Sequence, residues 1–167
     1  MIEYRQISPD SPLYPGACEL RELVLLRPIG YDMARFKAGY PGVEERGVHF
    51  VAAMETPGGP RVVGSALLIS ETDEPGRGKL MQMAVHPQRQ GEGIGKRLVI
   101  EAETHAFTEL GLEGLFCHAQ LDAIPFYEKL GWRTDSETFQ EAGIPHKKMR
   151  LDRPTAVGSP PLPVSEW

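Results

Sequence analysis

The chain has 167 residues, which is enough for one domain but too few for two hydrophobic cores of ordinary size. Hydrophobic residues make up 41% of it and charged residues 25%, as in an ordinary globular protein. The 18 Lys and Arg against 23 Asp and Glu give a formal net charge of −5. This balance argues against a nucleic-acid partner, because phosphate contacts need clustered cations.

Long apolar segments are missing from the sequence. No run approaches the ~18 residues of a membrane span, and residues 1–6 have no apolar core like that of a signal peptide. The two cysteines, Cys18 and Cys117, cannot by themselves form a disulfide framework or a zinc site. We therefore expect two free thiols, no metal, no membrane partner and a cytoplasmic location.

Apolar periodicity and turn residues predict a series of helices and strands. In chain order they are a strand at 2–7, helices at 17–27 and 31–37, strands at 48–54, 61–70 and 79–85, a helix at 94–110, a strand at 114–119, a helix at 123–130, and strands at 133–140 and 146–151. We expect helices on both faces of a mixed sheet, in one domain over residues 1–152. Residues 153–167 form a Pro-rich tail that we expect to be extended or disordered.

The segment at 86–97 is rich in glycine and lies between a predicted buried strand and an amphipathic helix. Its glycines, Gly91, Gly93 and Gly95, allow close approach of a ligand to the backbone N–H groups. The helix N-terminus adds partial positive charge. Cations outnumber acids here, the charged residues being Arg89, Glu92, Lys96 and Arg97. The segment therefore predicts a phosphate or pyrophosphate site rather than a turn that needs glycine only for packing.

Two common phosphate motifs do not fit this segment. A P-loop ending at Lys96 needs Gly at position 90 and Ser or Thr at 97, which are Gln90 and Arg97. A Rossmann fingerprint needs Gly at position 96 or 98, which are Lys96 and Leu98. These failures count against a general nucleotide-binding protein.

The pattern Gln90-x-x-Gly93-x-Gly95 after a strand ending at Val85 resembles the acetyl-coenzyme A pyrophosphate loop of the GNAT superfamily of N-acetyltransferases. The sequence FYEKLGW at 126–132 is similar to the second signature of that family. GIPH at 143–146 resembles a C-terminal hairpin of one bacterial branch. The resemblance covers residues 1 to about 152. It implies an α/β (α+β) fold with a mixed, mostly antiparallel central sheet of about seven strands flanked by helices.

The resemblance also implies a binding site for acetyl-CoA as cosubstrate. The strand at 79–85 would splay from the strand at 114–119, and the pantetheine would lie in the gap. Backbone groups of Met83 and Val85 would pair with the pantetheine and polarise the acetyl carbonyl. The residues assigned to the coenzyme are Met83, Ala84, Val85, Arg89, Gln90, Gly91, Glu92, Gly93, Ile94, Gly95 and Lys96.

Three residues are candidates for proton transfer. Tyr127 matches the tyrosine that faces the coenzyme sulfur in the family, and a phenol suits the general acid for a departing thiolate. Several members carry a glutamate early on the fourth strand, where this chain has Lys79, which cannot accept a proton while charged. His118 and His146 are the candidate bases, with His146 favoured by the GIPH resemblance, and a water chain is a third possibility.

The predicted function is transfer of the acetyl group of acetyl-CoA to a primary amine by direct attack in a ternary complex. The alternative is a non-catalytic acyl-CoA-binding or sensing domain on the same fold. The acceptor is a small-molecule amine or an amine of a peptide or protein. The last hairpin and the tail make a homodimer possible.

Two further expectations concern side-chain placement. Strict alternation along the strand at 79–85 puts Gln82 and Ala84 on one face, where Gln82 is a candidate to meet the acceptor. The opposite face then carries Met81, Met83 and Val85. The charges at 44–45 and 71–74 are expected to be solvated, and Cys117 to be buried and inert.

Overall fold

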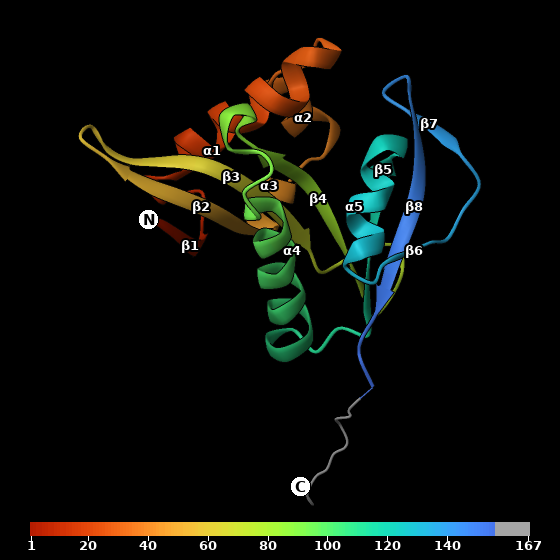
Figure 1. Ribbon diagram of the computed structural model, residues 1–167. Coiled ribbons are helices and arrows are strands. Elements are labelled where there is room, and N and C mark those ends of the chain that lie inside the picture. Colours follow the sequence, from red (N-terminus) through yellow and green to blue (C-terminus); the bar gives the residue numbers. More distant parts are fainter. Residues whose placement is uncertain (156–167) are drawn as a thin grey trace, which may run out of the picture.

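The computed structural model describes residues 1–155 as a single central sheet with helices on both faces (Figure 1). The helices are α1 (Tyr14–Arg21), α2 (Met33–Gly39), α3 (Val43–Arg46), α4 (Ile94–Thr104) and α5 (Ile124–Lys129). The strands are β1 (Ile2–Ile7), β2 (Val48–Thr56), β3 (Gly59–Ile69), β4 (Arg77–Val85), β5 (Gly114–Gln120), β6 (Arg133–Thr134), β7 (Phe139–Glu141) and β8 (Ile144–Asp152).

The strand order across the sheet is β1-β2-β3-β4-β5-β8-β6, and β7 pairs with β8. Within residues 1–155, β4 and β5 are the one parallel pair, and every other pairing is antiparallel. This confirms the predicted mixed, mostly antiparallel sheet. The strand predicted at 133–140 is two separate strands, β6 and β7, which raises the number of strands to eight.

Alternate residues of the central strands pack into apolar layers on opposite faces of the sheet. On β2, Phe50 and Ala52 pack toward α4 and α5, whereas Val51 and Ala53 pack toward α1. A third cluster joins α2 to β3 through Phe36 and neighbouring residues. Apolar layers therefore cover both faces of β2 and β3, whereas most residues of β4 are only half-buried.

The predicted hairpins are both present. β2 and β3 meet at Thr56 and Gly59, and β7 and β8 meet at Glu141 and Ile144. The second turn is tighter than the predicted span of 141–145, because Ala142 and Gly143 both have positive φ and close a two-residue turn.

Two predicted helices change from α-helical to π-helical hydrogen bonding toward their C-terminal ends. The helix predicted at 17–27 begins earlier, with a proline in its first turn, and after Arg21 it widens into a π-helical turn at Glu22–Leu26. The long helix likewise widens after Thr104. The spacing of apolar side chains in the sequence does not reveal where backbone hydrogen bonds change from partners four residues apart to partners five residues apart. Most of the predicted tail lies outside the described residues, and no helix within residues 1–155 could cross a membrane.

Candidate active site

A gap opens between β4 and β5 part-way along their length (Figure 1). The two strands pair only where Arg77–Lys79 face Gly114–Phe116. β4 continues to Val85 and β5 to Gln120, yet their remaining residues do not pair with each other. This confirms the predicted splay and leaves backbone groups of β4 without a ladder partner on that side.

A bulge lies in β4 beside this gap. Leu67 faces Met81 and Ser65 faces Ala84, so one residue of β3 stands opposite both Gln82 and Met83. Gln82 has φ of 55°, a conformation that non-glycine residues rarely adopt.

The bulge overturns the strict alternation predicted for this strand. Met81 packs with the α2 cluster and Ala84 with the α1 cluster, while Met83 and Val85 pack on the α4 side. Met81 therefore shares a face with Gln82 and Ala84, contrary to the prediction, because the extra residue of the bulge shifts the pattern by one.

The glycine-rich segment joins the end of β4 to α4, as predicted. Gly91 and Gly93 have φ of 82° and 86°, and space is open where a Cβ would stand on either residue. The Gln90 side chain donates to the carbonyl of Val85 at 3.2 Å and so ties the loop to the strand. Arg89 pairs with Glu92 at 3.2 Å, and Lys96 is exposed.

The first turn of α4 has the features of an anion-binding site. Gly93 is the N-cap residue and contributes no side-chain hydrogen bond, so the N–H groups of this eleven-residue helix are open at its start. Open N–H groups and the helix dipole attract an anion, and Arg89 and Lys96 add positive charge nearby.

Tyr127 lies on α5 and is 7% exposed. Its neighbours include Phe126, Trp132 and the thiol of Cys117 on β5. Burial raises the pKa of Tyr127 above its ordinary value, and the contact with Cys117 raises it further. The phenol therefore keeps its proton at neutral pH. Burial also raises the pKa of Cys117 to about 12, which agrees with the expected inert thiol.

His118, the next residue on β5, points to the opposite face from Cys117. Its Nδ1 lies 2.8 Å from Oε1 of Glu141 on β7, and its side chain is 26% exposed. A carboxylate only accepts hydrogen bonds, so Nδ1 carries the proton and donates. In the neutral ring, Nε2 is then a free proton acceptor.

His146 on β8 lies in the same cluster but is almost closed off. Its Nδ1 lies 2.7 Å from the carbonyl of Ile144, its Nε2 lies 4.0 Å from Oε2 of Glu141, and its side chain is 8% exposed. The structure thus places His146 close to His118 but gives it less access to a substrate.

Glu141 links these two histidines, and the sequence reasoning missed it. The hydrogen bond from His118 holds the pKa of Glu141 below its ordinary range, with Lys79 and His146 adding to the effect and burial opposing it. Glu141 directly precedes the hairpin turn and pairs with Ile144 of the GIPH sequence. This position in the sequence could have indicated Glu141 as a site residue.

Glu44 was expected to be solvated, and this is wrong. Its side chain is 2% exposed and accepts two hydrogen bonds of 2.8 Å from Arg21, which is 1% exposed. The carboxylate lies on the short helix α3, whose existence the sequence pattern did not predict.

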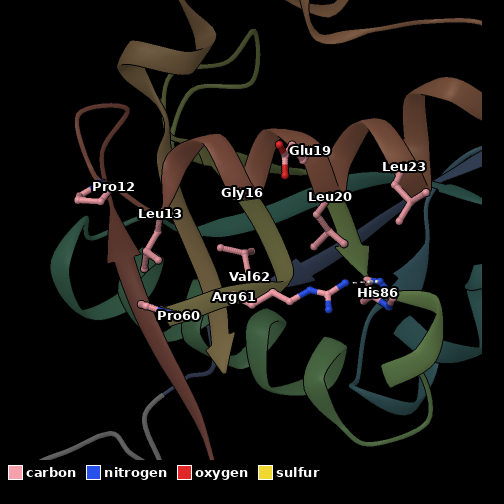
Figure 2. A pocket seen from close by; sticks show the side chains of 10 residues that line it. All are labelled: Pro12, Leu13, Gly16, Glu19, Leu20, Leu23, Pro60, Arg61, Val62 and His86. Carbon is pink, nitrogen blue, oxygen red and sulfur yellow. Dashed lines mark hydrogen bonds between the residues drawn. The ribbon is translucent and has the colours of Figure 1, made fainter. Parts of the chain in front are cut away.

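A separate cavity of about 300 Å³ lies under α1 (Figure 2). Leu20 of α1 and Leu23 of the π-helical turn that follows it form one wall, and the Arg61 side chain extends to within 3.4 Å of His86. Among residues 1–155, none of the predicted catalytic or coenzyme-binding residues lines it.

A family model described as "Acetyltransferase (GNAT) domain" matches residues 37–153. The chain belongs to the GNAT acetyltransferase family. The match covers the gap, the glycine-rich loop and the histidine pair, so the family resemblance of the two sequence motifs is confirmed.

Individual relatives agree with this membership. The chain is 38% identical to the uncharacterized N-acetyltransferase YjcF of Bacillus subtilis over 78 residues, which are 46% of this chain and 55% of that protein. The chain spans about half the length of the curated relatives it matches first.

Solved structures share the fold at low sequence identity. Escherichia coli ElaA has a TM-score of 0.75 at 18% identity, covering 91% of this chain and all of its own. An aminoglycoside 6′-N-acetyltransferase complexed with coenzyme A has a TM-score of 0.71 at 16% identity, covering 92% and 99%.

Proposed function

We propose that this protein transfers the acetyl group of acetyl-CoA to a primary amine of an acceptor by direct attack in a ternary complex. The observation that carries the proposal is the gap between β4 and β5, together with the open N-terminus of α4 that follows β4. Tyr127 contacts Cys117 on one face of β5, and His118 lies on the other face. The similar fold of an acetyltransferase complexed with coenzyme A supports the choice of cosubstrate.

The coenzyme supplies an activated thioester, and residues of this chain hold it. The N–H groups around Gly91, Gly93 and Gly95 would take the pyrophosphate, with Arg89 and Lys96 neutralising its charge. The free edge of β4 at Met83 and Val85 would pair with the pantetheine amides as an added strand.

His118 is the general base in this proposal. An amine such as a lysine side chain has a pKa of ~10.4, so its ammonium form must lose a proton before attack at neutral pH. Glu141 fixes the tautomer by accepting from Nδ1 and leaves Nε2 to take that proton. His146 is the weaker candidate because its side chain is closed off and bonded to its own turn.

Tyr127 is the general acid, and β4 stabilises the developing negative charge. The raised pKa of Tyr127 keeps the phenol protonated, ready to donate to the departing thiolate. Backbone N–H groups at Met83 and Val85 would polarise the acetyl carbonyl without help from a side chain.

A screen of amine acceptors tests this proposal against a binding or sensing role. Release of free thiol from acetyl-CoA should rise above the rate without acceptor for at least one class among small amines, peptides and proteins. Binding of acetyl-CoA without thiol release for any acceptor would favour the non-catalytic alternative. A cytoplasmic location and a homodimer stay predictions.

A further inference from the structure

A buried ion pair lies behind the bulge of β4. Arg21 at the end of α1 donates from both terminal nitrogens to Glu44 of α3, at 2.8 Å each. Tyr14 donates to the same carboxylate at 2.6 Å, and the His49 ring bonds the backbone carbonyl of Glu44 at 2.8 Å. The two buried charged residues, Arg21 at 1% and Glu44 at 2% exposure, are thus fixed by further contacts from α1 and β2.

A further hydrogen bond joins the pair to the bulge of β4. Nε of Arg21 donates to Oε1 of Gln82 at 3.0 Å. Arg21 therefore donates two hydrogen bonds to Glu44 and one to Gln82, the bulge residue of β4. Because the guanidinium is planar and rigid, anchoring one edge fixes the direction of the Nε–H on the other.

Gln82 is held in a costly conformation. Of the two non-glycine residues with positive φ in residues 1–155, Ala142 lies in a hairpin turn that requires it, whereas Gln82 lies within a strand. Strain of this kind persists only where the surroundings enforce it, and it concentrates at functional sites. A buried ion pair is itself a weak source of stability, because desolvation offsets much of the attraction.

We propose that Arg21, anchored by Glu44, is a positioning residue that holds Gln82 and thereby fixes the β4 bulge next to Met83. This inference rests on the proposed function, in which backbone groups at Met83 meet the acyl carbonyl. A bulge free to relax would turn those groups away from the reacting atoms while the pyrophosphate site at α4 stays intact. The clamp therefore acts on turnover rather than on coenzyme affinity.

Gln82→Asn and Gln82→Gly separate the clamp from the backbone conformation. Asn and Gly both tolerate positive φ. The Asn side chain is one methylene shorter than that of Gln and Gly has no side chain, so neither reaches Arg21. We expect kcat, with the amine that the acceptor screen identifies, to fall about tenfold in each variant, while the affinity for CoA by calorimetry changes less than about twofold. Arg21→Lys, which keeps the charge but loses Nε–H, should reproduce the loss.

Tyr14→Phe is the matched control. It removes one hydrogen bond from Glu44 but leaves the contact between Arg21 and Gln82, so kcat should stay at the wild-type value even where the melting temperature falls. Amide hydrogen exchange at Ala84, which follows the bulge and pairs with Ser65 of β3, gives a readout that needs no acceptor. It should speed up about tenfold or more in Gln82→Asn and stay unchanged in Tyr14→Phe.

Wild-type kcat together with wild-type exchange at Ala84 in both Gln82 variants would overturn the clamp. The proposed function fails differently, through wild-type protein that binds no CoA and releases no thiol with any amine. In that case the exchange rates at Ala84 still decide whether Arg21 and Gln82 fix the bulge.

Discussion

The two ends of the β4–β5 junction are built in opposite ways. At the closed end, Arg77–Lys79 pair with Gly114–Phe116, and a Cβ on Gly78 or Gly114 would collide with neighbouring atoms. Asp152 forms ion pairs at this end with three arginines, Arg77 at 2.9 Å, Arg150 at 2.9 Å and Arg133 at 3.0 Å. At the open end, β4 bulges, β5 turns away, and Gly91 and Gly93 stand in open space.

This contrast shows how the fold separates stability from chemistry. Backbone and charged groups at the closed end are satisfied by other parts of the protein. Those at the open end, including the start of α4 and the free edge of β4, are left for a ligand. Substitutions at the two ends should therefore have different consequences.

The largest expected effect is the loss of coenzyme binding in Gly93→Val. A β-branched residue at φ of 86° displaces the first turn of α4, whose N–H groups form the proposed pyrophosphate site. Calorimetry should show affinity for CoA at least ~100-fold weaker. Gly111→Val is the matched control, because Gly111 also has positive φ and open space but lies beyond the far end of the helix. Equal loss in both variants would mean that helix strain, not the loop, controls binding.

Tyr127→Phe should lower kcat about 100-fold or more by removing the general acid, with CoA affinity nearly unchanged. The raised pKa of Tyr127 adds a prediction for pH. Because the phenol stays protonated past its ordinary value of 10, wild-type kcat should show no alkaline decline due to Tyr127 below pH 10. Turnover in the phenylalanine variant equal to wild type would remove Tyr127 from the mechanism.

His118→Asn should reduce kcat about 100-fold and abolish the acidic limb of the pH–rate profile. His146→Asn is the comparison at the neighbouring position, and we expect it to lower stability more than turnover, because His146 is closed off. A reversed order of the two kcat values would assign the base to His146. Normal profiles in both variants would leave a water chain as the base.

Asp152→Asn should have the smallest effect, confined to the closed end. The three arginines hold the pKa of Asp152 below its ordinary value, so its contribution to stability is present above that value and is lost as pH falls through the lowered one. We expect a slightly lower melting temperature at pH 7, a difference that shrinks in acid and at high salt, and unchanged kcat. A large loss of turnover would show that the closed end shapes the site.

Sequence patterns predicted the parts of the site that local chemistry dictates. Glycine at 91 and 93 permits the positive φ that both residues adopt, and the four-residue apolar period from Ile94 is typical of a helix, so loop and helix were both predicted. The bulge at Gln82 was not predicted, because a one-residue shift in strand register depends on how β3 pairs with β4.

Long-range contacts account for the remaining omissions. In the sequence Glu44 resembles a solvated loop charge, because its partner Arg21 lies 23 positions away and only the fold brings the two together. Glu141 contacts His118 only because β7 pairs with β8 and β8 pairs with β5. Residue type alone suggested both histidines, but only burial and hydrogen bonding distinguish His118 from His146.

Titration calorimetry of the wild-type protein with acetyl-CoA, CoA, ATP and NAD tests the central claim most directly. The account predicts saturable binding of one acetyl-CoA or CoA per chain, with no comparable heat from ATP or NAD. Folded protein that gives no heat with either CoA species would contradict the claim that the open end of the β4–β5 junction is a coenzyme site.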